Sequence, residues 1–196
     1  YGTSFIHNGF ALKINPLGDS LINKTFNDSI DTISKLITIK QLSDGNYFLI
    51  GVKGHIQPPA MRLFNKIWIL YVNQNLDTIW TKTIPLADTN LMIDYLFCDK
   101  KGDNISIICT ASKYPLLYDI IFFYEINTTG QLIKSKSCNT NTQGDLMDFI
   151  YNKCNKKYYL YCLASFLNQG SEQVVFDSNF NFISAHSVNS FTAVYN

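Results

Sequence analysis

The chain has 196 residues, of which 46% are apolar, 14% aromatic and 16% charged, so it is too hydrophobic and too weakly charged to be disordered. Sixteen Lys and Arg against 15 Asp and Glu give a net charge of +1, which removes long-range attraction to nucleic acid or to an anionic membrane as a basis for function. The length suits one or two domains with a sizeable core. The longest apolar stretches, 63–72 and 116–126, are too short to span a bilayer as helices, so membrane insertion is not expected.

Four segments share an apolar run, a turn rich in Asn, Asp and Gly, and a second run, which is typical of a β-hairpin. They are 12–26, 70–84, 124–138 and 174–188. The same turn position is held by Asn15, Asn73, Asn127 and Asp177, at steps of 58, 54 and 50 residues. This self-similarity predicts a repeat protein.

A second family of hairpins lies between the first, at 36–52, 94–111 and 147–164. The turns of the first two carry Gly45 and Gly102, where a positive φ is favoured. No window shows a sustained 3.6-residue apolar stripe, so helices are expected to be minor. Four-stranded antiparallel units about every 50 residues predict an all-β chain, a β-propeller in which each sheet is one blade.

The first half of the chain resembles a known type of repeat. DGNYFLIG at 44–51 followed by IWILYVNQNLDTIWTKTI at 67–84 is similar to the propeller repeats common in secreted and cell-surface proteins of Bacteroidota, in which a DGGY-type strand precedes a W-x-K-T segment. At the Trp80 position the other repeats have Ile22, Lys134 and Ser184, so the docking role of that tryptophan is open in the last two. The resemblance implies an exported protein, extracellular or at the cell surface.

Four tripeptides fit the Asp-Ser/Thr-aliphatic pattern that Bacteroidota O-glycosylate on exported proteins. They are 19–21, 28–30, 31–33 and 77–79. The same tripeptides also arise at ordinary junctions between a turn and a strand. They are compatible with export without requiring it.

The repeats predict one propeller unit over 1–196, with repeats at about 1–34 (partial), 35–88, 89–142 and 143–190, and the start of another at 191–196. This amounts to about three and a half to four blades. Propellers close with typically 4 to 8 blades, so the chain is expected to form part of a larger ring. The alternative is a closed four-bladed ring in which 1–5 pairs near the C-terminal strand.

In such a fold the hairpin turns lie on one face and the longer links on the other, and varied loops often carry function. The longest predicted links are 53–66, with His55 and Arg62, and 112–119, with Tyr114 and Tyr118. Arg and Tyr are frequent at binding hot spots, so these four residues are the candidate ligand-binding residues. The competing interpretation is ordinary loops whose aromatic side chains pack on their own blade.

No cofactor or metal site is predicted. The odd number of cysteines, with no C-x-x-C spacing, indicates free thiols, and the three histidines show no metal-ligand spacing. The turns 73–77 and 177–181 place oxygen side chains as a calcium loop does, but lack its glycine at position 6 and glutamate at position 12, so they are interpreted as tight turns. No nucleophile elbow or phosphate-binding loop occurs.

The leading hypothesis is therefore a non-catalytic, exported propeller domain that presents loops for protein or glycan binding. The rival is a propeller-based glycan hydrolase or lyase with acidic residues at the central channel. The two differ in one structural expectation, since the enzyme needs carboxylates or histidines from several blades in one pocket.

Overall fold

The computed structural model describes residues 8–26, 33–57, 61–113, 116–139, 144–164 and 171–188. Within these ranges the chain is all-β and forms no helix, so none is present that could cross a membrane. The strands are β1 Gly9–Ile14, β2 Ser20–Phe26, β3 Ile33–Gln41, β4 Tyr47–Gln57, β5 Met61–Val72, β6 Thr78–Pro85, β7 Leu91–Lys101, β8 Asn104–Lys113, β9 Leu116–Ile126, β10 Leu132–Asn139, β11 Gly144–Asn152, β12 Lys157–Ala164, β13 Ser171–Phe176 and β14 Phe182–Val188.

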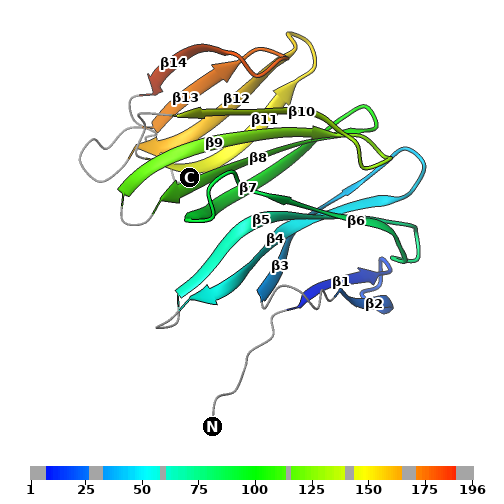
Figure 1. Cartoon of the computed structure of the whole chain (residues 1–196). Helices are drawn as coiled ribbons and strands as arrows, with labels where there is room; N and C mark the ends of the chain where they lie inside the picture. Colours follow the sequence, from blue (N-terminus) through cyan, green and yellow to red (C-terminus); the bar gives the residue numbers. More distant parts are fainter. Residues whose placement is uncertain are drawn as a thin grey trace, which may run out of the picture.

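These strands form four antiparallel sheets in chain order (Figure 1). We call β1–β2 the ribbon, and β3–β6, β7–β10 and β11–β14 the second, third and fourth sheets. Each pairs its strands in sequence order. All seven predicted hairpins are present, so the assignment of these segments is confirmed.

The turn between the last two strands of each sheet is built in the same way. In the second sheet, Asn73 Oδ1 accepts hydrogen bonds from the backbone N–H groups of Asn75 (2.9 Å) and Asp77 (2.8 Å). Asn15, Asn127 and Asp177 accept the corresponding pairs in the other three turns. The oxygen side chains that suggest a calcium loop therefore serve to close a tight turn.

The fourth residue of the last turn in each sheet has a positive φ. Gly18 and Gly130 supply it in two turns, whereas Leu76 (φ 61°) and Phe180 (φ 61°) supply it in the others. A left-handed conformation costs a side-chain-bearing residue roughly 1–2 kcal/mol. Burial offsets this cost, because Leu76 is 2% exposed and Phe180 is 4% exposed.

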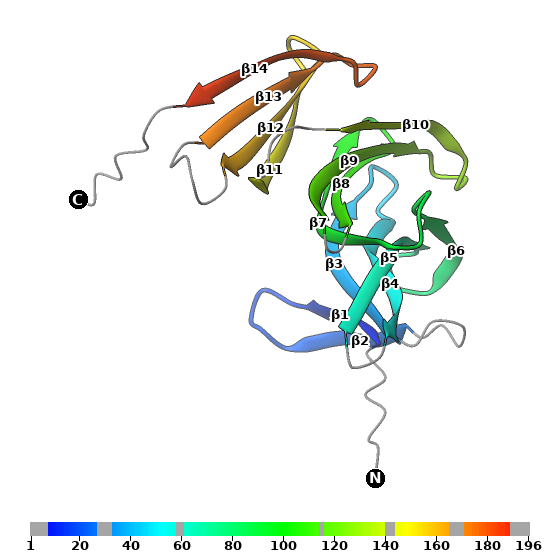
Figure 2. The ribbon, with the colours of Figure 1, turned by 60° about the vertical axis from the view of Figure 1, so that its left-hand side comes forward.

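The sheets stack face to face with a separate apolar core between each successive pair. The ribbon packs on the second sheet around Trp68, the second on the third around Ile69 and Ile107, and the third on the fourth around Phe123 and Tyr158. Figure 2 shows the four sheets arranged along an open arc, with the ribbon at one end and the fourth sheet at the other.

The first strands of successive sheets come together on one side of the stack, where β3 contacts β7 and β7 contacts β11. This is the edge at which residues far apart in the sequence can share a site. The hairpin turns all lie at one end of the strands and the links at the other, as antiparallel pairing in sequence order demands.

The prediction of a long loop at 53–66 is wrong. β4 continues to Gln57 and β5 begins at Met61, with Lys53 paired to Lys66 and a bulge next to Gly54. The close approach explains the glycine, since a Cβ at Gly54 would lie 1.7 Å from the Leu63 backbone oxygen. The predicted link 112–119 is likewise mostly strand, because β8 reaches Lys113 and β9 begins at Leu116.

Candidate functional site

The first strand of each four-stranded sheet contains a β-bulge at a corresponding place. The strand register shifts at Ile37 in β3, at Asp94 in β7 and at Met147 in β11, so that each is the extra residue of its bulge. A bulge bends a strand and redirects its side chains, and bulges are frequent beside functional sites. Residues at or just after these bulges line a pocket.

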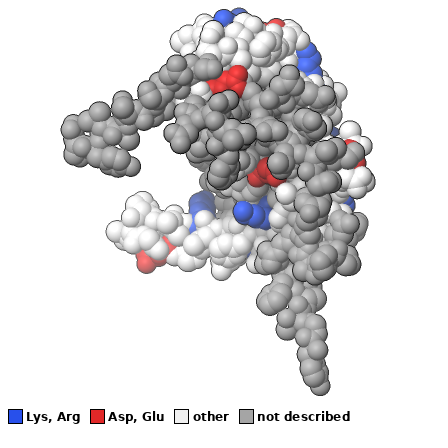
Figure 3. All heavy atoms as spheres, turned by 90° about the vertical axis from the view of Figure 1, so that its left-hand side faces the viewer, with Lys and Arg blue, Asp and Glu red and all other residues white. Residues whose placement is uncertain are grey.

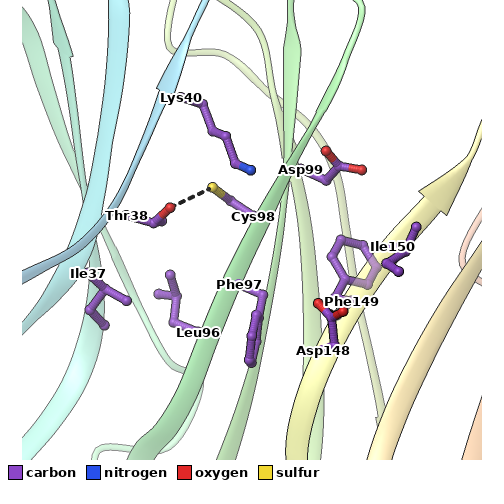
Figure 4. A pocket seen from close by; sticks show the side chains of 10 residues that line it. All are labelled: Ile37, Thr38, Lys40, Leu96, Phe97, Cys98, Asp99, Asp148, Phe149 and Ile150. Carbon is purple, nitrogen blue, oxygen red and sulfur yellow. Dashed lines mark hydrogen bonds between the residues drawn. The ribbon is translucent and has the colours of Figure 1, made fainter. Parts of the chain in front are cut away.

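The pocket has a volume of about 460 Å³, within the range of roughly 300–1,000 Å³ that is usual for small-ligand sites. Three strands from three different sheets line it (Figure 4). The lining residues are Ile37, Thr38 and Lys40 of β3, Leu96, Phe97, Cys98 and Asp99 of β7, and Asp148, Phe149 and Ile150 of β11.

The β3 side of the pocket contains a cation and a thiol. The Cys98 thiol donates a weak hydrogen bond to Thr38 Oγ1 at 3.8 Å, and Lys40 lies on the same side of β7 in Figure 4. Burial raises the pKa of Cys98 to about 11, outweighing the Thr38 hydrogen bond and the Lys40 charge, which lower it. The thiol is therefore protonated at neutral pH and is unsuited to act as a nucleophile.

The β11 side carries the two carboxylates. Asp99 Oδ1 accepts from the Lys100 N–H at 2.7 Å, and Asp99 Oδ2 accepts from the Tyr151 N–H at 3.2 Å. Asp99 thus joins the third sheet to the fourth. Asp148 is exposed, and its Oδ1 accepts a hydrogen bond from the Phe149 N–H at 2.7 Å.

Apolar surface completes the site. Ile37 is 42% exposed and Ile150 is 46% exposed, which is high for strand residues this close to a core. They flank polar groups of both signs, Lys40 on one strand and Asp148 on another. This mixture of apolar walls and few polar groups is typical of a pocket that orients a small polar ligand.

Of the four residues predicted to bind a ligand, only His55 has a described side chain, and it is not among the residues that line the pocket. His55 lies on β4, exposed, with its backbone paired to Leu63. Arg62 lies on β5 and Tyr118 on β9, and the side chains of both are outside the described part of the structure, as is Tyr114 altogether. Their role in binding stays a prediction.

The five cysteines are free thiols, as predicted, with Cys98, Cys109 and Cys162 buried and Cys154 exposed. His55 on β4 and His186 on β14 come from different sheets. In the described ranges, no group of three or more His, Cys, Asp or Glu side chains is placed to hold a metal ion.

Figure 3 shows one side of the molecule, where Lys or Arg and Asp or Glu form small separate spots on the described surface. This mixed pattern agrees with the net charge of +1. Comparison with protein-family models and with curated proteins finds no match for the chain.

Proposed function

We propose that the chain is part of a β-propeller that binds a small glycan in the pocket formed by β3, β7 and β11, without transforming it. The observation that carries this proposal is the convergence of three first strands from three sheets on one pocket with polar groups of both signs. In a propeller the first strands of the blades surround the axis. The pocket would then lie at the mouth of the central channel.

A glycan suits the chemistry of this pocket. Sugar hydroxyls accept hydrogen bonds from an ammonium group such as Lys40 and donate them to a carboxylate such as Asp148. The aliphatic walls, Ile37 and Ile150, can contact the C–H faces of a sugar ring. Because all these side chains project from paired strands, binding would need little ordering of the protein.

The test is a glycan-binding screen of the full chain, followed by calorimetry on the best ligand. Lys40→Met should weaken binding about tenfold or more, because it removes a charged hydrogen-bond donor. Lys35→Met is the matched control, since Lys35 is an exposed lysine on the same strand that is not among the lining residues. Equal affinities of the two variants would refute the pocket as the site.

Catalysis is the second candidate, because Asp99 and Asp148 from two sheets line one pocket. A glycosidase needs one carboxyl to donate a proton and another to act as base or nucleophile. Asp99 is instead engaged at both oxygens by backbone N–H groups, which favours its role in joining sheets. Release of reducing sugar from the bound glycan, abolished by Asp148→Asn, would replace the binding proposal with the enzymatic one.

Export is part of the same proposal. Two of the candidate O-glycosylation sites, Ser20 and Thr78, are exposed at the start of β2 and β6. Their accessibility supports a modified, exported chain. Mass spectrometry of the protein purified from its native source tests this, since an unmodified mass would remove that support.

A further inference from the structure

The same contacts recur at each boundary between successive sheets. Lys24, Lys82 and Lys136 lie on the last strand of the ribbon, the second sheet and the third sheet, and each reaches the last turn of the following sheet. Their acceptors are Asp77 Oδ1, Gly130 O and Asn181 Oδ1. These boundaries therefore have a direction, with a donor on the earlier sheet and an acceptor turn on the later one.

The acceptor half of such a boundary is exposed on the ribbon. Asp19 occupies the position that Asp77 has in the second sheet, and its Oδ2 accepts from Asn15 Nδ2 at 2.9 Å, as Asp77 Oδ2 accepts from Asn73 Nδ2 at 3.2 Å. In Asp77, Oδ1 receives the lysine of the preceding sheet. In Asp19, no partner for Oδ1 is present among the described residues.

The apolar face of the ribbon is exposed where the equivalent faces are buried. Ile14, Leu12 and Phe10 are 55%, 50% and 52% exposed. In the other three sheets, the residues one, three and five positions before the first residue of the last turn are at most 7% exposed, with one exception. These buried residues are Val72, Leu70 and Trp68 in the second sheet, Ile126, Tyr124 and Phe122 in the third, and Phe176 and Val174 in the fourth. The ribbon thus presents a core-forming face of about the same composition.

The donor half of the boundary lies at the other end of the arc. His186 of β14 pairs with Gln173, just as Lys82 pairs with Ile69 and Lys136 with Phe123. Residues directly opposite share a face of the sheet, so His186 faces away from the third sheet, at the lysine position. Tyr159 and Tyr161 lie on the same outer face, because the alternate residues of β12, Tyr158 and Leu160, point into the core with the third sheet.

We propose that these two end faces bind each other between two copies of the chain. The outer face of the fourth sheet of one copy covers Phe10, Leu12 and Ile14 of the other, and His186 donates to Asp19 Oδ1 across the boundary. The contact is head to tail, so the same pairing can form twice and close a ring of two copies. A second copy of the chain is a suitable partner because each copy exposes one donor face and one acceptor face. These are the same two kinds of face that meet at the three boundaries between its own sheets.

The test is sedimentation velocity on the full chain over a range of concentrations. We expect a species of twice the chain mass of 22.4 kDa. Leu12→Lys places a charge in the proposed contact and should raise the dissociation constant by at least about 30-fold, the effect of losing a hot spot. Ile79→Lys is the matched control, because Ile79 is a 52% exposed strand residue on β6, away from both end faces.

Mixing two variants tests the direction of the contact. His186→Glu should block the donor face and Leu12→Lys the acceptor face, so each alone should be monomeric. When the two variants are mixed, the intact acceptor face of the His186→Glu chain can bind the intact donor face of the Leu12→Lys chain, so a dimer should form. An interface between two identical patches would not be restored by mixing. The proposal is overturned by a monomeric wild-type chain, by association that Ile79→Lys weakens as much as Leu12→Lys, or by failure of the mixed variants to associate. Circular dichroism of each variant shows whether the fold is retained.

Discussion

Phe180 gives a direct test of the turn geometry. Its backbone is left-handed, with φ 61°, at the position that glycine holds in two of the other turns. Its ring stacks on Phe123 at 4.3 Å and on Phe176 at 4.2 Å between centroids. The position therefore combines backbone strain with tight aromatic packing, and two substitutions separate these contributions.

Phe180→Ala should lower the free energy of unfolding by about 3–5 kcal/mol, because it leaves a cavity between aromatic rings. Phe180→Gly loses the same contacts but relieves the left-handed strain. The glycine variant should therefore be about 1 kcal/mol more stable than the alanine variant. In an ordinary strand the order is the opposite, with glycine less stable by roughly 0.5–1 kcal/mol.

Urea unfolding followed by the fluorescence of Trp68 and Trp80 measures this difference, provided that the slope with denaturant is unchanged. Phe176→Ala and Phe176→Gly form the control pair, since Phe176 lies in β13 and is 1% exposed. At Phe176 alanine should be the more stable variant. The reasoning fails if the order at Phe180 is the same as at Phe176.

The other predictions concern single sites. Gly51→Ala should lower the free energy of unfolding by about 3 kcal/mol, because the added Cβ would lie 2.0 Å from a backbone oxygen of β3. Gly102→Ala should lower it by about 1 kcal/mol, because Gly102 has open space around it but a φ of +64°. Urea unfolding compares the two variants. Trp80→Phe should cost about 1 kcal/mol through loss of its 2.9 Å hydrogen bond to the next sheet's turn, and an unchanged unfolding midpoint would contradict this. The Cys98 thiol has its ordinary pKa of 9.0 when the chain is unfolded and a pKa of about 11 when it is folded, so between these pH values the folded state keeps a proton that the unfolded state has lost. The free energy of unfolding should therefore fall as the pH rises through this window, by up to about 1.4 kcal/mol per pH unit. The fall should be less steep in Cys98→Ala, which lacks the thiol. In the native protein at pH 8, a thiol reagent should modify exposed Cys154 within minutes and Cys98 at the rate of unfolding; equal rates would contradict its burial.

The hairpins could be predicted from the sequence because their information is local. A turn such as 73–77 carries its own closing group, Asn73, and the flanking apolar runs set the strands. The links were harder to predict, since 53–66 contains glycine and prolines that also end strands. The pairing of Lys53 with Lys66 across a bulge depends on how closely two backbones approach, which composition does not reveal.

The pocket could not be predicted from the sequence because no local pattern joins its residues. Thr38 and Cys98 are 60 residues apart and Cys98 and Asp148 are 50 residues apart, and the three meet only when three sheets stack. The one usable signal was the repeat itself, which places these residues on equivalent strands. The predicted propeller places its first strands side by side, and that expectation points to these residues rather than to the segment 53–66 that contains His55 and Arg62.

The boundary between sheets also shows why the repeat weakens in sequence while its contacts persist. Trp80 Nε1 donates to the Thr128 backbone oxygen at 2.9 Å, and Lys134 Nζ donates to the Ser178 backbone oxygen at 3.2 Å. Indole and ammonium differ in size and charge, yet each brings an N–H donor to the same carbonyl of the following turn. The requirement comes from the turn, whose carbonyl needs a donor whichever side chain supplies it. The acceptor turn is consequently the better marker of the repeat, and Lys134 preserves a docking contact that a search for tryptophan would miss.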